Sequence, residues 1–136
     1  MSEELRMRGG RSLAQALEEY LADWSARTGI TVEVWALPAR DTSHVVVRAV
    51  LATLEEALSN VERHSMAALV SVAVTLGRSG LRMTVSDHGI GFDGAATGRG
   101  VAAMRARLAE IGGTLTVNGV PGGGTTVTAT VPRGRV

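Results

Sequence analysis

Two alternating segments joined by a four-residue connection constrain the fold of this chain more than any other feature of its sequence. Apolar residues take every second position on both sides of Gly77-Arg78-Ser79-Gly80, at Val70, Val72, Val74 and Leu76 before it and at Leu81, Met83 and Val85 after it. This period of two predicts β-strands, and so short a connection requires the two strands to be antiparallel. A second pair with the same pattern surrounds a turn at Pro121 to Gly124 and predicts another hairpin.

Three other segments have apolar residues at helical spacing. The first lies between Ser12, which can cap a helix, and Gly29, which can end one. The second runs from about residue 43 to residue 64. The third ends at Gly112-Gly113. Between the first two, residues 30–35 alternate again and predict a strand that stops near Pro38. The resulting order predicts an α/β (α+β) two-layer sandwich, with three helices on one face of a mixed, largely antiparallel sheet.

The length of the chain, 136 residues, suits one compact domain. We expect residues 1–11 to be a linker or a frayed end, residues 12–132 to form the domain, and residues 133–136 to be a tail. No apolar stretch approaches the roughly 20 residues that cross a bilayer, so we expect no membrane contact by this segment. The lack of cysteine and of a secretory leader favours a cytoplasmic location.

The charge pattern argues against a nucleic-acid partner. The chain has fourteen basic residues, all of them arginine, and thirteen acidic residues, and both kinds are scattered along the sequence. With aromatic residues at 3%, the sequence has neither the basic stripe nor the stacking surface that nucleic-acid binders use. The absence of lysine also excludes a Walker A phosphate-binding loop.

Three polar residues of the second helix, Glu56, Asn60 and Arg63, are spaced four and three positions apart on the face opposite its apolar stripe. A solvated outer face would explain them without any function. The same side chains could also offer oxygen ligands to Mg²⁺, a general base, and a bidentate contact to phosphate. The residues alone leave both interpretations open.

An acidic residue at a strand end forms the second candidate site. Asp87 follows an apolar strand and precedes Gly89 and Gly91, so its carboxylate could accept a hydrogen bond from an exocyclic amine such as that of adenine. The bare glycines would admit a planar ring. Gly89, Gly91 and Gly94 also match the dinucleotide-binding G-x-G-x-x-G spacing, but that interpretation is disfavoured because the strand closes a hairpin and no helix follows at once.

Two further glycine-rich segments complete the candidate sites. Gly98-Arg99-Gly100-Val101 precedes the third helix, where unpaired N–H groups could bind phosphate, although a flexible connector would look the same. Thr125 follows the second hairpin turn and begins a strand. The three histidines, His44, His64 and His88, lack zinc-binding spacing and form no nucleophilic triad signature.

Taken in order, these segments resemble the ATP-binding domain of sensor histidine kinases, in the GHKL or HATPase_c family. The resemblance covers about residues 12–132 and rests on four boxes in the family's order: Glu56 to Ser65, Asp87 to Phe92, Gly98 to Arg107, and Gly112-Gly113 with Pro121 to Thr125. It is strongest for the branch paired with LuxR/NarL-type response regulators. The resemblance implies the Bergerat fold, an α/β sandwich.

The resemblance also implies a role for each candidate residue. Asn60 would hold Mg²⁺, and Glu56 would be the catalytic base or a carboxylate of the metal shell. At the adenine end, Asp87 would bind the amine, Gly89 and Gly91 would lie beside the ring, and Thr125 would support the same end. At the phosphate end, Arg63 and His64 would lie toward the phosphates. The lid beside the triphosphate would contain Gly98, Gly100 and Val101.

The implied activity is transfer of the γ-phosphate of ATP to a histidine on a separate helical dimerisation domain, and from there to an aspartate of a response regulator. We expect this chain to be an incomplete kinase, because no helix with a phosphoacceptor histidine precedes Ser12. It departs from the family at Val101, where leucine is usual, and residues 93–97 leave a short lid. Two alternatives are a serine kinase of the anti-sigma-factor type and a degenerate module that binds partners without ATP.

Overall fold

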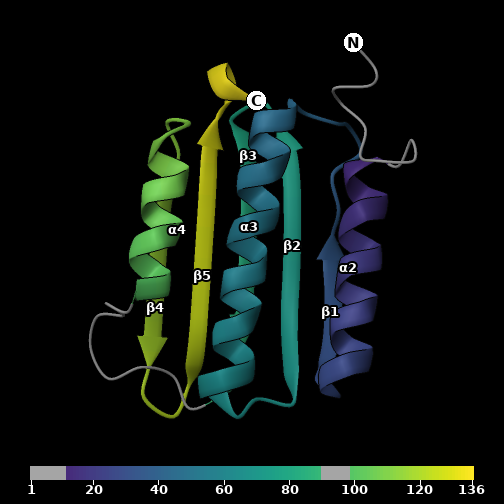
Figure 1. Ribbon diagram of the computed structural model, residues 1–136, viewed down its shortest axis with the longest axis vertical. Helices are drawn as coiled ribbons and strands as arrows, with labels where there is room; N and C mark the ends of the chain where they lie inside the picture. Colours follow the sequence, from purple (N-terminus) through teal and green to yellow (C-terminus); the bar gives the residue numbers. More distant parts are fainter. Residues whose placement is uncertain (1–11, 90–98) are drawn as a thin grey trace.

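The computed structural model describes residues 12–89 and 99–136, so the predicted linker at residues 1–11 lies outside the described residues. In chain order the elements are α2 (Leu13–Thr28), β1 (Thr31–Ala36), α3 (His44–Asn60), β2 (Leu69–Gly77), β3 (Gly80–Asp87), α4 (Arg99–Ala109), β4 (Thr114–Val120) and β5 (Gly124–Pro132) (Figure 1). The predicted succession of helices and strands is confirmed in these regions.

The strands form one five-stranded sheet in the order β1-β2-β3-β5-β4. β1 pairs with β2 in parallel, and every other neighbouring pair is antiparallel. The helices α2, α3 and α4 lie side by side over one face of this sheet (Figure 1). The predicted two-layer sandwich with a mixed, largely antiparallel sheet is therefore confirmed.

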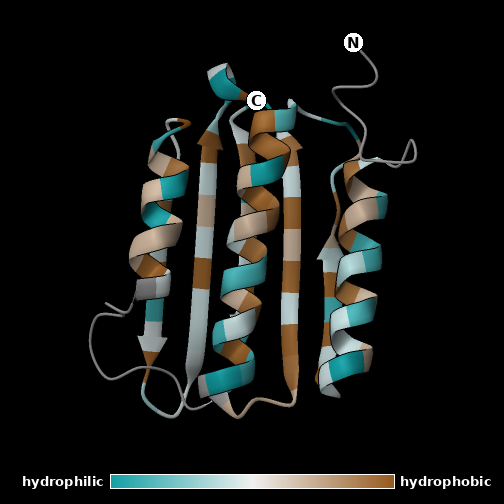
Figure 2. Cartoon of the chain, in the orientation of Figure 1, coloured by the Kyte–Doolittle hydropathy of each residue, from teal (hydrophilic) through white to brown (hydrophobic). Residues whose placement is uncertain are grey.

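Apolar side chains fill the space between the helices and the sheet. Hydrophobic residues alternate with less hydrophobic ones along β2 and β5, as a period of two requires (Figure 2). The largest fully buried side chains include Leu17, Leu54, Leu58, Met83, Met104 and Leu108. Through this core α3 contacts β3 and β5, and α4 contacts α3 and β4, so packing sets how the ends of these elements lie relative to one another.

The first helix begins and ends where its sequence predicts. The Ser12 hydroxyl accepts a hydrogen bond from the Gln15 N–H at 3.2 Å, and Gln15 Oε1 accepts one from the Ser12 N–H at 2.9 Å. This reciprocal pair satisfies N–H groups that have no partner within the helix. Gly29, with a φ of 78°, ends α2 in the left-handed conformation that glycine adopts at little cost.

The second helix is confirmed in its position but differs at its carboxyl end. α3 is a regular α-helix from His44 to Asn60, and one turn of π-helix, Val61–Ser65, continues it. Met66 then takes a φ of 58° and the helix ends. Five residues are too few for apolar spacing to distinguish a π turn from an α turn, so the sequence pattern predicted a uniform helix to His64. Single π turns are frequent at functional sites.

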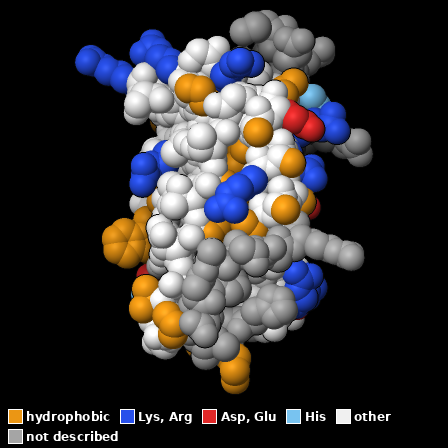
Figure 3. All heavy atoms as spheres, turned by 90° about the vertical axis from the view of Figure 1, so that its left-hand side faces the viewer, with side chains coloured by type: hydrophobic (Ala, Val, Ile, Leu, Met, Phe, Trp, Pro, Cys, Tyr) orange, Lys and Arg blue, Asp and Glu red, His pale blue; other side chains and the backbone are white. Residues whose placement is uncertain are grey.

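The surface carries dispersed charges and, on the edge strand β1, two large exposed apolar residues. Arginine side chains are spread over the face on the α4 and β4 side rather than gathered in one patch (Figure 3). Val34 and Trp35 of the edge strand β1 are 44% and 73% exposed.

Residues 133–136, predicted as a tail, include a 3₁₀ turn at Arg133–Arg135 that contacts β3. Among the described residues, no helix is both long enough and apolar enough to span a membrane.

Candidate functional site

The polar residues predicted to share one face of the second helix do lie together. Arg63 Nη2 donates a hydrogen bond to Asn60 Oδ1 at 3.0 Å and lies 3.4 Å from Glu56 Oε2. The Arg63 and Glu56 side chains are 54% and 32% exposed, so water screens this ion pair and it adds at most about 1 kcal/mol to the stability of the fold. The three side chains instead present a carboxylate, an amide oxygen and a guanidinium to solvent within one small cluster.

The first turn of α4 approaches this cluster at Gly100. A Cβ atom built on Gly100 would collide with Glu56 Oε2 and would lie 2.9 Å from Glu56 Cδ. Beside this contact, a groove of about 260 Å³ is lined by Ala52, Glu55, Glu56, Ala103, Met104 and Arg107. Val101, next to Gly100, is 4% exposed and packs in the core. The carboxylate of Glu56 therefore lies where α3 meets the start of α4.

The other predicted acid, Asp87, is the last residue of β3 and is 5% exposed. Its Oδ1 accepts a hydrogen bond from the Gly89 N–H at 2.8 Å. Within residues 12–89 and 99–136, the second carboxylate oxygen of Asp87 receives no hydrogen bond. Because an ionised carboxylate can accept hydrogen bonds on both of its oxygens, this second oxygen can accept one from a ligand donor.

Thr125 lies directly beside Asp87 in the sheet. The two residues are paired across β3 and β5, and Thr125 is 8% exposed. Gly124, the first residue of β5, has a φ of 92°, and a Cβ on it would collide with the carbonyl oxygen of Asp87. The start of β5 is therefore in close contact with the backbone of Asp87. Asp87, Gly89 and Thr125 form one group.

The two groups lie at the same end of the sandwich. In Figure 1 the carboxyl end of α3, the end of β3, the start of α4 and the start of β5 all lie at the lower end of the molecule. The elements that carry the Glu56–Asn60–Arg63 cluster and the elements that carry Asp87 and Thr125 thus reach the same end of the sandwich, on its helical and sheet sides. Gly91 and Gly98 lie outside the described residues, as does the side chain of His64, whose backbone belongs to the π turn.

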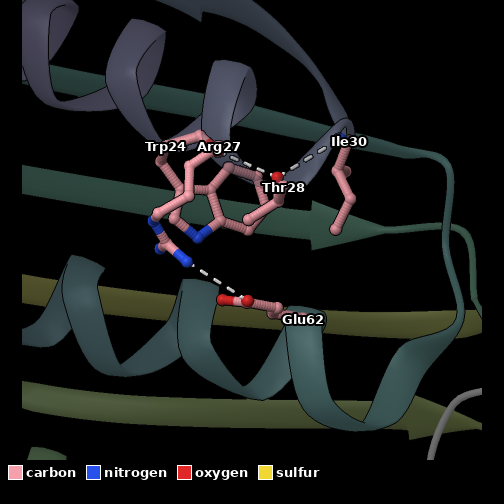
Figure 4. A network of polar contacts seen from close by, with 5 residues as sticks. All are labelled: Trp24, Arg27, Thr28, Ile30 and Glu62. Atoms are coloured by element: carbon pink, nitrogen blue, oxygen red, sulfur yellow. Dashed lines mark hydrogen bonds and ion pairs between the residues drawn. The ribbon is translucent and has the colours of Figure 1, made fainter.

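One contact near the site had no signal in the sequence. Arg27 Nη1, near the end of α2, lies 3.3 Å from Glu62 Oε2 in the π turn (Figure 4). The same end of α2 is held by Thr28, whose hydroxyl donates to the Trp24 carbonyl at 2.9 Å and accepts from the Ile30 N–H at 3.2 Å. This arrangement ties α2 to the turn that carries Arg63. Because Arg27 and Glu62 are far apart in the chain, no periodicity could pair them.

The described residues offer oxygen ligands but no complete metal site. Among them, no group of three or more His, Cys, Asp or Glu side chains could hold a metal ion. Mg²⁺ is commonly bound by one or two protein oxygens together with phosphate oxygens and water. Asn60 and Glu56 fit that donor chemistry, because each presents an oxygen at the solvent-facing side of α3.

Comparison with known proteins shows which family the chain resembles. The family described as "Histidine kinase-, DNA gyrase B-, and HSP90-like ATPase" matches residues 45–135. The sensor histidine kinase MctS of Rhizobium johnstonii is 35% identical over 142 residues, covering 98% of this chain and 31% of that protein. LiaS of Bacillus subtilis, also a sensor histidine kinase, is 36% identical over 126 residues, covering 90% of this chain and 35% of that protein. The chain thus spans about a third of the length of these curated relatives.

Solved structures of low sequence identity share the fold. The histidine kinase domain of the blue-light activated kinase of Erythrobacter litoralis EL346 superposes with a TM-score of 0.77 at 22% identity, covering 90% of this chain and 61% of that one. The ATP-binding domain of PrrB from Mycobacterium tuberculosis has a TM-score of 0.68 at 18% identity, covering 89% and 93%. Because the family match covers most of the chain, the chain belongs to the histidine kinase-, DNA gyrase B- and HSP90-like ATPase family, as a domain similar to the ATP-binding part of sensor histidine kinases.

Proposed function

We propose that this chain binds Mg-ATP and donates the γ-phosphate to a histidine on a separate helical domain, as the catalytic part of a sensor histidine kinase. The observation that carries the proposal is that Asp87 and the Glu56–Asn60–Arg63 cluster, predicted from separate segments, lie at the same end of the sandwich. Two polar groups of this kind can hold the base and the phosphates of one nucleotide.

The base would bind at the end of β3. The buried carboxylate of Asp87 has one oxygen committed to the Gly89 N–H, and its other oxygen can accept the exocyclic amine of adenine. Thr125, paired with Asp87 in the sheet, is placed to support the same edge of the ring, directly or through water. Gly89 and Gly91 would border the ring, since neither has a side chain to obstruct it.

The phosphates would lie between α3 and the start of α4. Arg63 carries a guanidinium that can bind phosphate bidentately, His64 follows it, and the N–H groups at the start of α4, near Gly98, Gly100 and Val101, favour negative charge. Asn60 and Glu56 would hold Mg²⁺, whose positive charge would offset that of the phosphates when it is bound. Glu56 is also placed to orient or deprotonate the attacking group.

Transfer would then depend on position and charge more than on covalent chemistry by this domain. The acceptor histidine would come from a helical dimerisation domain, and the phosphate would pass on to an aspartate of a response regulator, in a cytoplasmic two-component system. The sequence boxes favour a LuxR/NarL-type regulator, and the relatives that are sensor histidine kinases support a role in a histidine kinase in general. The domain by itself would be an incomplete enzyme.

Titration with Mg-ATP tests this proposal. A ligand that binds the folded state raises the free energy of unfolding, by about 1.4 kcal/mol at a tenfold excess over its Kd. We therefore expect the melting temperature of the full chain to rise steadily with Mg-ATP concentration, as followed by differential scanning fluorimetry.

Mg-GTP at the same concentrations is the matched control. Guanine carries a carbonyl oxygen where adenine has its exocyclic amine, so Asp87 would face an acceptor and the rise should be much smaller. A melting temperature that stays constant with both nucleotides would count against nucleotide binding and favour a module that acts without ATP. Equal rises with both would count against the role of Asp87.

Asn60→Asp should disturb the metal-dependent part of binding. The substitution keeps the shape of the side chain but adds a negative charge next to the triphosphate, and it strengthens the hold on Arg63, which already donates to Asn60 at 3.0 Å. We expect the gain in ATP affinity on adding Mg²⁺ to rise about fivefold, equivalent to about 1 kcal/mol, because the new carboxylate repels metal-free ATP and can itself bind Mg²⁺. Calorimetric titrations with Mg²⁺ and with a chelator measure this gain.

Ser79→Asp is the control for charge alone, because Ser79 is exposed in the turn between β2 and β3 at the opposite end of the molecule. It should leave the Mg²⁺-dependent gain unchanged. If both variants change the gain equally, Asn60 has no special relation to the metal.

A further inference from the structure

Gly100 is unusual because the carboxyl group of a distant residue occupies the space of its missing side chain. A Cβ on Gly100 would collide with Glu56 Oε2 and would lie 2.9 Å from Cδ and 3.2 Å from Cγ of the same side chain. Real Cβ atoms essentially never approach other heavy atoms closer than 3.0 Å. Any other residue at this position would therefore move the Glu56 carboxylate.

The backbone of Gly100 does not explain why glycine is present. Gly100 lies within α4, and it is absent from the described glycines that have a positive φ, which are Gly29, Gly80, Gly112, Gly122 and Gly124. Alanine is a better helix former than glycine at such a position. What distinguishes Gly100 is therefore its contact with Glu56, whose flexible side-chain end would have to move to make room for a Cβ.

The same carboxylate is held from its other side by the polar cluster of α3. Arg63 Nη2 lies 3.4 Å from Glu56 Oε2, and it donates to Asn60 Oδ1 at 3.0 Å. Displacing Glu56 from Gly100 would therefore also disturb its ion pair with Arg63. The missing side chain of Gly100 thus leaves room for a carboxylate that also contacts Arg63.

We propose that Gly100 is a positioning residue for Glu56: its bare Cα admits the carboxylate to the first turn of α4 and so sets the Glu56–Arg63–Asn60 cluster in place for the phosphates of ATP. This inference rests on the proposed function. It differs from a role in which the glycine itself contacts phosphate or loosens a lid, because the contact that matters is with a side chain of α3.

A double-mutant cycle in the full chain tests this role. The variants are Gly100→Ala, Glu56→Ala and the two combined, each measured for its Kd for Mg-ATP by calorimetry and for its melting temperature without nucleotide. We expect Gly100→Ala to weaken Mg-ATP binding about fivefold when Glu56 is present and less than about twofold when Glu56 is already alanine, since contacting residues couple and separated ones do not. Glu56→Asp, one methylene shorter, should recover part of the loss caused by Gly100→Ala.

Ala102→Gly is the control for helix propensity, because its side chain is exposed in the same part of α4. It should change the melting temperature without changing the Kd. If Gly100→Ala alone loses its cooperative melt, the variant that also carries Glu56→Ala should regain it, because the methyl group then has room. A combined variant that also fails to melt cooperatively would overturn the inference.

The outcomes separate the two proposals. Equal losses from Gly100→Ala in both backgrounds would show that the glycine serves something other than Glu56, and would overturn the positioning role while leaving nucleotide binding intact. A wild-type chain that does not bind Mg-ATP would overturn the proposed function and this inference with it.

Discussion

Asp87→Asn should weaken ATP binding by about 10- to 100-fold, the loss expected when a hydrogen bond to a charged group is replaced by a mismatched pair. The carboxylate of Asp87 can accept two hydrogen bonds, one from the Gly89 N–H at 2.8 Å and one from the adenine amine. An asparagine amide has one acceptor oxygen and one NH₂ group that only donates. Its oxygen can therefore accept from one of these two N–H groups, and its NH₂ group would face the other donor without forming a hydrogen bond. Calorimetric titration with Mg-ATP measures the effect.

Asp41→Asn provides a matched control. Asp41 Oδ1 accepts a hydrogen bond from the Leu13 N–H at 2.8 Å, which is the same kind of contact at the opposite end of the molecule. This variant should alter the melting temperature but leave the Kd within about twofold, because distant sites act independently. An Asp87→Asn variant that folds and binds ATP as tightly as the wild type would rule out the adenine contact.

Gly124→Ala should lower the free energy of unfolding by about 3 kcal/mol. Its φ of 92° lies in the left-handed region, which costs an L-residue about 1–2 kcal/mol. The new methyl group would also collide with the carbonyl oxygen of Asp87 and lie 3.0 Å from its carbonyl carbon and 3.1 Å from His88 Cα. Since all of these atoms belong to the backbone, they can give way only if β3 and β5 separate.

Gly122→Ala isolates the conformational part of this cost. Gly122 has a φ of 76°, but nothing lies within 4 Å of the position of its Cβ, so we expect a loss of about 1 kcal/mol. Urea unfolding of both variants gives the comparison. Equal losses in the free energy of unfolding would mean that the close contact between β5 and Asp87 adds nothing to the cost of the Gly124→Ala substitution. We also expect Gly124→Ala, but not Gly122→Ala, to weaken ATP binding, because the collision moves the strand end that carries Asp87.

The sequence predicted the elements well where their determinants are local. The two hairpins follow from a period of two and short connections, and the ends of α2 follow from Ser12 and Gly29, which act on their own helix. The cluster of Glu56, Asn60 and Arg63 was also predictable, because helical spacing alone places these residues on one face. The π turn at Val61–Ser65 was not, since its five residues have no distinguishing period.

The chain's residues by themselves determined which segments are helices and strands and which side of each faces the core, because these depend on neighbours within a few positions. The nucleotide-binding roles were instead predicted from the resemblance to a family. Only the tertiary structure decided which distant groups meet. It paired Asp87 with Thr125 across two strands, and it placed the carboxylate of Glu56 against Gly100 on another helix. Such contacts arise from the packing of whole elements around a shared core, which local spacing does not encode.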